Sequence, residues 1–432
     1  MIQKERINEE KLLAETPLLL LAMLPYTLSK RAPHQIFSYA NQDKESLLGN
    51  VEEYKKIAQV YRKLEYIYLN DVTVLSKIAD TIKDSFLSRL FHEYIMTYLS
   101  RGINLDTLNN LASHVLTELK HRISQKMSLL LQWIEVMVLT ISIFSLVMLL
   151  AGLGTSYMLF SIAAIITFMS IIAIPLIRLE YVDTYIRVNT DPLTLLLYAI
   201  GLVILILCLY NDWSIYTASI AFLVTIYTII RSYTTIISTL QTTNNILYTL
   251  RVLSDTLSVS TTSPRIVELL SRDERIPREI ISILKGGIPN SSSSGNNIVK
   301  AMARLLAIII RSGKEAIPSI RLIYNVLNDI YESVKKTIMN GVVQLSLLAG
   351  SVLVLILTFK YLTTLFTTNT FLQGFINPFT VSSTAINIVI KIIAISSSAA
   401  SLAISYILFK RHISANFVAP IILYVTILIT KT

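Results

Sequence analysis

Apolar residues in this chain are gathered into long runs rather than spread evenly. A transmembrane helix needs about 20 mostly apolar residues to cross a hydrocarbon core of roughly 30 Å. Seven segments fit this pattern, the last of them short, and predict seven membrane spans: Val136–Leu153, Tyr157–Ile177, Leu193–Tyr210, Ile215–Ile230, Val342–Phe359, Ala385–Phe409 and Ala415–Thr430. The charged stretch Met1–Leu12 lacks the apolar region of a signal peptide, so we expect a span to direct insertion.

The segments between these runs follow a helical pattern. From Phe86 to Leu99 apolar residues recur at spacings of three and four, which is typical of a helix with one buried face. After Gly102 a second such pattern continues from Leu108 to Met127. No Gly or Pro interrupts Ile103 to Ala151, so we expect one helix that enters the first span without a break.

The same pattern returns 211 residues later. Gly102 corresponds to Gly313, and both helices that follow these glycines continue into a span. The apolar positions that coincide are Leu90, Phe91, Tyr94, Ile95, Tyr98, Leu99, Leu111, Val115, Leu116, Leu119, Ile123 and Met127 with Ala301, Met302, Leu305, Leu306, Ile309, Ile310, Leu322, Val326, Leu327, Ile330, Val334 and Ile338. Coincidence between two amphipathic helices is the simpler alternative, but the matching glycine and membrane entry favour duplication.

Composition supports a membrane protein. Of the 432 residues 53% are apolar and 15% charged, with a mean hydropathy of +0.59, whereas an average soluble domain has about 25% charge. An ordinary soluble enzyme is therefore excluded. The single cysteine, Cys208, excludes a disulfide framework and a CxxC site.

The basic residues indicate the orientation. Of 38 Lys and Arg residues, 35 lie on one predicted side of the membrane, which is typical of the cytoplasmic side. We therefore expect an all-α polytopic protein of the cytoplasmic membrane with about seven transmembrane helices and two homologous cytoplasmic helical bundles. Residues 1–128 and 231–340 form the bundles, with the N-terminus cytoplasmic, and residues 129–230 and 341–432 form the membrane part.

This layout resembles the platform proteins of type II secretion systems, type IV pili, tight-adherence pili and the archaellum. The stretch Glu15–Leu20 resembles the Glu-x-Pro-apolar opening of the cytoplasmic bundle in archaeal members, and Phe86–Leu105 resembles its helix and glycine-containing turn. The resemblance covers residues 15 to about 410. The chain departs from the family at Arg31-Ala32-Pro33, where a Gly often precedes the Pro, and in having more spans than the bacterial secretion members.

The resemblance implies a structural platform with no catalytic activity of its own. A hexameric secretion-type ATPase would act on this platform and move pilin subunits from the bilayer into a filament. The resemblance also suggests that the platform is a homodimer. A polytopic transporter or channel is the alternative, although charged residues lie mainly at the ends of the spans. We expect no cofactor and no nucleic-acid partner.

Three kinds of residue are candidates for partner contacts. Arg101 and Gly102 in the first bundle, with Arg311, Gly313 and Lys314 in the second, stand at predicted tips where an acidic ATPase surface could dock. Contact with anionic lipid is the alternative role for these basic residues. Glu135 precedes the first span and Lys391 lies inside the sixth, and both are candidates for contact with pilin, against solvation or snorkelling.

Three further patterns have simpler explanations than a functional site. The small residues between Ser396 and Ala403 predict close helix packing, either within the chain or with a second copy. His114 and His121 stand seven residues apart without further His or Cys nearby, so we expect no metal site. The segment from Gly286 to Gly295 lacks the spacing of a phosphate-binding loop and is interpreted as a linker.

Overall fold

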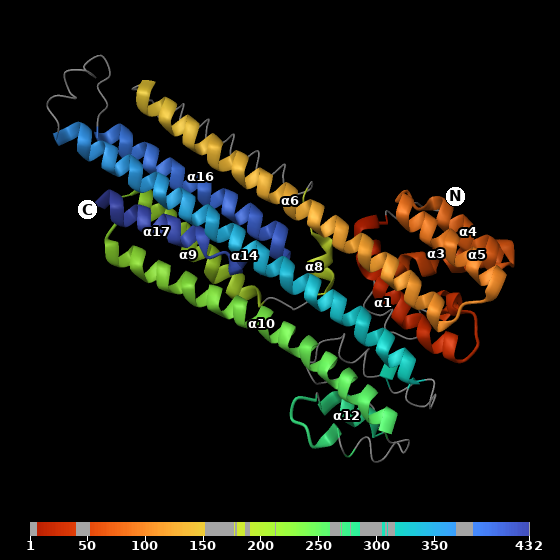
Figure 1. The fold of residues 1–432 in the computed structure, drawn as a ribbon. Coiled ribbons are helices and arrows are strands. Elements are labelled where there is room, and N and C mark those ends of the chain that lie inside the picture. Colours follow the sequence, from red (N-terminus) through yellow and green to blue (C-terminus); the bar gives the residue numbers. More distant parts are fainter. Residues whose placement is uncertain are drawn as a thin grey trace. The chain divides into compact units, whose positions relative to one another are not determined.

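The computed structural model describes residues 7–39, 52–151, 177, 179–185, 191–211, 213–259, 268, 270–276, 278–285, 305, 306, 309, 316–368 and 383–431. Helices are the only regular secondary structure in these residues (Figure 1). They are α1 (Glu9–Leu28), η1 (Pro33–Gln35), α2 (Ile36–Tyr39), α3 (Glu52–Tyr68), α4 (Asp71–Thr81), α5 (Ser85–Arg101), α6 (Leu105–Ala151), α8 (Glu180–Tyr185), α9 (Pro192–Tyr210), α10 (Ile215–Val259), α12 (Arg278–Leu284), α14 (Ala316–Thr368), α16 (Ser383–Phe409), η4 (Lys410–Ala415) and α17 (Val418–Lys431).

The chain divides into two compact units. The first comprises Met1–Arg122, Thr184–Ile186 and Ser238–Lys335, and the second comprises the remaining residues. Both predicted soluble segments therefore contribute to the first unit. The helices α6, α10 and α14 each contribute residues to both units without a break.

Helix α1 is the core helix of the first unit. By length and composition alone it is one of six helices that could cross a membrane, together with α6, α9, α10, α14 and α16. Yet every residue from Leu12 to Leu24 is buried within the chain, and α1 packs against the strongly charged, amphipathic helix α3. A helix that is apolar on all sides is buried either in lipid or in a protein core, and here the protein supplies the cover.

Helices α3, α4 and α5 form the rest of the N-terminal bundle. Asn70 caps α4 and Asp84 caps α5, each accepting hydrogen bonds from backbone N–H groups of the first turn. Helix α5 ends at Gly102, whose φ of +72° lies in the left-handed region that glycine adopts without a steric penalty. The predicted helix junction at Gly102 is thereby confirmed.

The long helix predicted after Gly102 is also confirmed. Helix α6 runs for 47 residues, so its length is about 70 Å at 1.5 Å per residue. Its first part, up to Arg122, packs in the first unit, and its later part belongs to the second unit.

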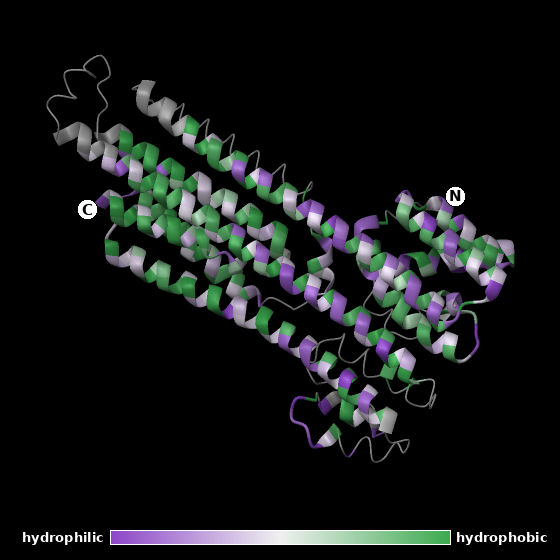
Figure 2. Cartoon of the chain, in the orientation of Figure 1, coloured by the Kyte–Doolittle hydropathy of each residue, from purple (hydrophilic) through white to green (hydrophobic). Residues whose placement is uncertain are grey.

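Apolar helices make up the second unit, as the green of α9, α16 and α17 shows (Figure 2). The run of small residues on α16 is buried against α17 of the same chain, where Ser398 Oγ lies 3.4 Å from the Ala419 carbonyl oxygen. Asn416 caps α17 through the N–H groups of Val418 and Ala419 and donates from Nδ2 to Ser401 Oγ at 3.0 Å. The stripe of small residues therefore serves packing within the chain.

The structure supports five of the seven predicted spans. These coincide with α6, α9, α10, α14 and α16, which are long and apolar enough to cross a membrane. The second predicted span, Tyr157–Ile177, lies outside the described residues except for Ile177. The seventh corresponds to α17, which has only 14 residues because η4 occupies Lys410–Ala415.

Candidate functional site

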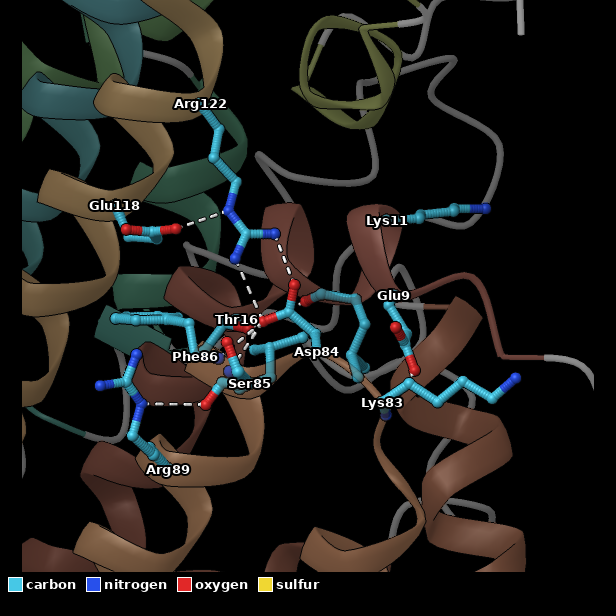
Figure 3. Close-up of polar contacts among 12 residues, drawn as sticks. Glu9, Lys11, Thr16, Lys83, Asp84, Ser85, Phe86, Arg89, Glu118 and Arg122 are labelled. Atoms are coloured by element: carbon cyan, nitrogen blue, oxygen red, sulfur yellow. Dashed lines mark hydrogen bonds and ion pairs between the residues drawn. The ribbon is translucent and has the colours of Figure 1, made fainter. Parts of the chain in front are cut away.

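A partly buried arginine connects the N-terminal bundle to the long helix α6 (Figure 3). Arg122 on α6 donates to both carboxylate oxygens of Asp84, with distances of 2.6 Å from Nη1 and 3.1 Å from Nη2. Its Nε donates to Glu118, one turn earlier on α6, at 2.6 Å. Such a bidentate arginine–carboxylate pair fixes orientation as well as distance. We call Asp84, Glu118 and Arg122 the clamp.

Asp84 holds two elements at once. The same Oδ1 that accepts from Arg122 also accepts the N–H groups of Phe86 and Leu87, each at 3.0 Å, at the start of α5. Burial by itself would raise the pKa of this carboxyl, but Arg122 and the two N–H groups hold its pKa below the usual range. The carboxylate is therefore ionised at neutral pH and ties the start of α5 to α6.

A second contact strengthens the same junction. The N–H of Lys83, in the turn before α5, donates to Glu9 Oε1 of α1 at 2.6 Å (Figure 3). Two neighbouring residues of the α4–α5 turn thus join it to other helices: Lys83 contacts the core helix α1, and Asp84 contacts α6. No sequence pattern marked Arg122, Asp84 or Glu118 as candidate functional residues. An Asp placed before an amphipathic helix was the available signal for a cap, but no sequence pattern identified its partner 38 residues later.

The second soluble segment also contacts α6 within the first unit. Lys120 Nζ lies 3.0 Å from Asp329 Oδ1 of α14, and both side chains are exposed. An exposed ion pair stabilises a fold by only about 0–1 kcal/mol, so this contact adds little to the free energy that holds α14 against α6. Asp329 occupies the repeat position of Glu118, 211 residues on.

The buried positions of α6 and α14 follow the predicted repeat. At the predicted offset of 211, Leu105 of α6 corresponds to Ala316, the first described residue of α14. Pairs of hydrophobic residues buried in both helices at this offset include Leu111, Ala112, Val115, Leu116, Leu119, Met127, Ile134, Met137 and Ile141 with Leu322, Ile323, Val326, Leu327, Ile330, Ile338, Leu345, Leu348 and Val352. The duplication itself stays a prediction, because Gly313 and most of the helix expected before it lie outside the described residues.

The predicted docking residues are only partly described. Arg101 is exposed at the end of α5, and Gly102 forms the turn before α6. Arg311, Gly313 and Lys314 lie outside the described residues. The structure therefore describes the first predicted tip, at Arg101 and Gly102. The second predicted tip stays a prediction.

His34 organises the end of the bundle where Arg101 lies. Its buried imidazole places Nε2 3.2 Å from Asp71 Oδ2 at the start of α4, and its ring lies 4.8 Å from that of Tyr98 near the end of α5. Burial lowers the pKa of His34, partly offset by Asp71. Three turns therefore meet at one end of the bundle: the turn before η1, the turn between α3 and α4, and the turn after α5.

Glu15 is buried at the opposite end. Its carboxylate accepts the backbone N–H groups of Glu52, Glu53 and Tyr54 at the start of α3, at 3.0, 2.9 and 3.4 Å. These are the N–H groups that a helix leaves without an internal partner. Burial raises the pKa of Glu15 to about 7, against the lowering effects of these bonds and of Lys11.

We expect the stability of the first unit to fall as pH rises from 5 to 8. The pKa of Glu15 is about 7 in the folded chain, above the ordinary value of 4.5, so the folded state binds the proton more tightly. The stabilising contribution of Glu15 is therefore fully present below pH 4.5. It is lost as pH rises through 7, which lowers the free energy of unfolding by up to about 3 kcal/mol. Chemical unfolding of the full chain at pH 5, 6, 7 and 8 measures this. Glu15→Gln, which mimics the protonated form, should remove this fall and leave the opposite contribution of His34, whose pKa is lowered by burial in the folded chain. An unchanged slope in this variant would contradict the assignment.

The two candidate membrane residues do not come together with the clamp. Glu135 on α6 is exposed, and Lys391 on α16 is half-buried. Both belong to the second unit. Nothing in their described surroundings distinguishes contact with pilin from solvation or snorkelling, so their contact with pilin stays a prediction.

The second unit carries an open groove along α14. It has a volume of about 760 Å³ and is lined by Ser142 of α6 and by Val342, Val343, Ser346, Leu347, Gly350, Ser351, Val354, Leu355 and Thr358 of α14. The serine and threonine hydroxyls each donate to a carbonyl one turn earlier in their own helix, at 2.7 to 2.9 Å. The lining therefore presents an apolar surface that suits another apolar helix.

Comparisons with known proteins found no match to a family model, to a curated protein or to a solved structure.

Proposed function

We propose that this chain is the membrane platform of a type IV filament assembly machine, serving a pilus, an archaellum or a secretion pseudopilus. In this role it couples a cytoplasmic secretion-type ATPase to the insertion of pilin subunits. The observation that carries the proposal is the clamp, because Arg122 fastens a soluble helical bundle to a helix that continues unbroken for 47 residues. A motor acting on the bundle would thereby move a membrane helix.

The groove supplies the second part of the proposal. A pilin subunit waiting in the bilayer presents one apolar helix, and the groove along α14 offers an apolar face with a small residue, Gly350, among its lining residues. Small residues allow helix backbones to approach closely in a membrane. The platform would hold the subunit there while the bundle transmits force from the ATPase.

We expect Gly350→Leu to abolish filament formation without reducing the amount of inserted protein. No atom lies within 4 Å of the position that a Cβ would occupy at Gly350, so the larger side chain fits the fold but occupies groove space. Filament yield on intact cells and cross-linking of the chain to pilin measure the effect. Gly350→Ala is the matched control and should retain filaments. Normal filaments in Gly350→Leu would remove the groove from the mechanism.

The proposed orientation places both soluble segments in the cytoplasm. In a chain with Cys208→Ala, single cysteines at the exposed positions Ser100 and Ser271 should resist a membrane-impermeant thiol reagent in intact cells. A cysteine at Asn211, exposed between α9 and α10, should react. The reverse pattern would invert the topology and refute an ATPase acting on the bundle.

A transporter or channel is the second candidate, and one observation favours it. Several polar atoms buried among the helices of the second unit have no hydrogen-bond partner within the described part of the chain: Thr194 Oγ1, Tyr233 OH, Gln344 Oε1, Ser396 Oγ, Ser397 Oγ and Ser405 Oγ. Polar groups inside a membrane domain can mark a solute pathway. Purification after gentle solubilisation distinguishes the two candidate functions. A platform should co-purify with pilin or an ATPase, whereas a transporter should retain a small solute.

A further inference from the structure

The turn between α3 and α4 exposes a row of apolar side chains to solvent. Tyr66, Ile67 and Leu69 are 88%, 64% and 90% exposed, although they belong to the soluble bundle and not to a membrane helix. The apolar residues of α3 that precede them, such as Tyr61 and Leu64, are buried. Contiguous apolar residues on a soluble surface commonly mark a site of interaction with another protein.

Leu69 stands in a backbone conformation that disfavours it. Its φ is +53°, in the left-handed region where a side chain with a Cβ is strained. Its N–H donates to the Glu65 carbonyl at 3.1 Å and closes α3, a turn that glycine or asparagine would form more easily. Because the leucine side chain is 90% exposed, it contributes little to the packing that would offset this strain.

Exposed cations lie in the other turns at the same end of the bundle. The contacts of His34 with Asp71 and Tyr98 bring the α3–α4 turn close to the end of α5, where Arg101 is exposed. Lys30 and Arg31, in the turn before η1, are exposed as well. Among the described residues, positive φ values occur at Lys30, Leu69 and Gly102, and all three lie in these converging turns.

We infer that Lys30, Arg31, Tyr66, Ile67, Leu69 and Arg101 form a docking surface for a soluble protein that presents an apolar pocket bordered by carboxylates. We call these residues the distal surface. The apolar side chains enter the pocket, and the three cations face its acidic border. Aromatic anchors within a charged surround are the usual composition of a binding hot spot. The inference rests on the proposed function only for the identity of the partner as the ATPase.

One other occupant fits the distal surface less well, and a lipid surface is an outcome of the test. A second copy of the chain would bring the same three cations together, and like charges at an interface are unfavourable.

A photoreactive p-benzoylphenylalanine at position 66 in the full chain tests the inference in living cells. After irradiation, mass spectrometry should identify a cross-link to a soluble protein, at a peptide containing apolar residues flanked by Asp or Glu. The same probe at Thr81, exposed at the opposite end of α4, should not form this cross-link. Cross-links confined to lipid, to this chain or to a second copy, or no cross-link at all, would overturn the inference.

Leu69→Asn separates binding from folding. Asparagine adopts a left-handed conformation readily, so the variant should be as stable as the natural chain while losing the apolar anchor. The cross-link yield from position 66 should fall about tenfold or more, as expected for the loss of a well-buried leucine. An unchanged yield would show that Leu69 is not an anchor. A soluble partner other than the ATPase would refute the proposed function but retain the docking surface.

Discussion

Replacing Arg122 with methionine should lower the free energy of unfolding of the first unit by about 2–3 kcal/mol. The substitution keeps the length of the side chain but leaves the Asp84 carboxylate without its bidentate partner. Breaking a buried ion pair in this way typically costs about 3–5 kcal/mol, and the partial exposure of Arg122 and Asp84 reduces that figure. Chemical unfolding of the full chain, together with hydrogen exchange at the start of α5, measures the loss.

Two matched variants make the test of the clamp specific. Arg89→Met removes an exposed arginine that donates only to the Ser85 carbonyl of its own helix, so its effect should stay within about 0.5 kcal/mol. Adding Asp84→Asn to Arg122→Met should recover part of the stability, because asparagine keeps the cap on α5 and removes the unpaired charge. Equal losses in Arg122→Met and Arg89→Met would show that the clamp does not hold α6.

The second large effect is expected at Gly201, where α9 lies close to α10. A Cβ at Gly201 would lie 2.4 Å from Thr225 Cγ2 and 3.3 Å from the Ala221 carbonyl oxygen. Gly201→Ala should therefore force the two helices apart and destabilise the second unit by about 1–3 kcal/mol. Thermal unfolding of the detergent-solubilised chain measures this change.

Thr225→Ser provides the rescue for this contact. Serine lacks the Cγ2 methyl that the new side chain would meet, and it keeps the hydroxyl that donates to the Phe222 carbonyl at 2.7 Å. The double variant should be more stable than Gly201→Ala alone. Gly350→Ala, which adds the same methyl group into open space, is the control and should leave the unfolding temperature nearly unchanged. If Gly201→Ala behaves like that control, the close approach of α9 and α10 is not required.

Patterns of apolar residues determined most of the secondary structure. The 3.6-residue period predicted α5 and α6, and the absence of Gly and Pro predicted that α6 continues into a span. Composition was less informative about α1. Helix α1 is long and apolar enough to cross a membrane. Only the burial of Leu12–Leu24 inside the bundle shows that protein rather than lipid covers it.

The contacts between distant residues were decided by the tertiary structure alone. The order of residues determined that Asp84 begins a helix and that Arg122 lies on another, because caps and helical periodicity depend on neighbours along the chain. It did not determine that they meet, since that pairing depends on how α5 packs on α6. The exposure of Leu69 is likewise a property of the folded bundle, because it depends on how the chain leaves α3 at the turn where Leu69 has a φ of +53°.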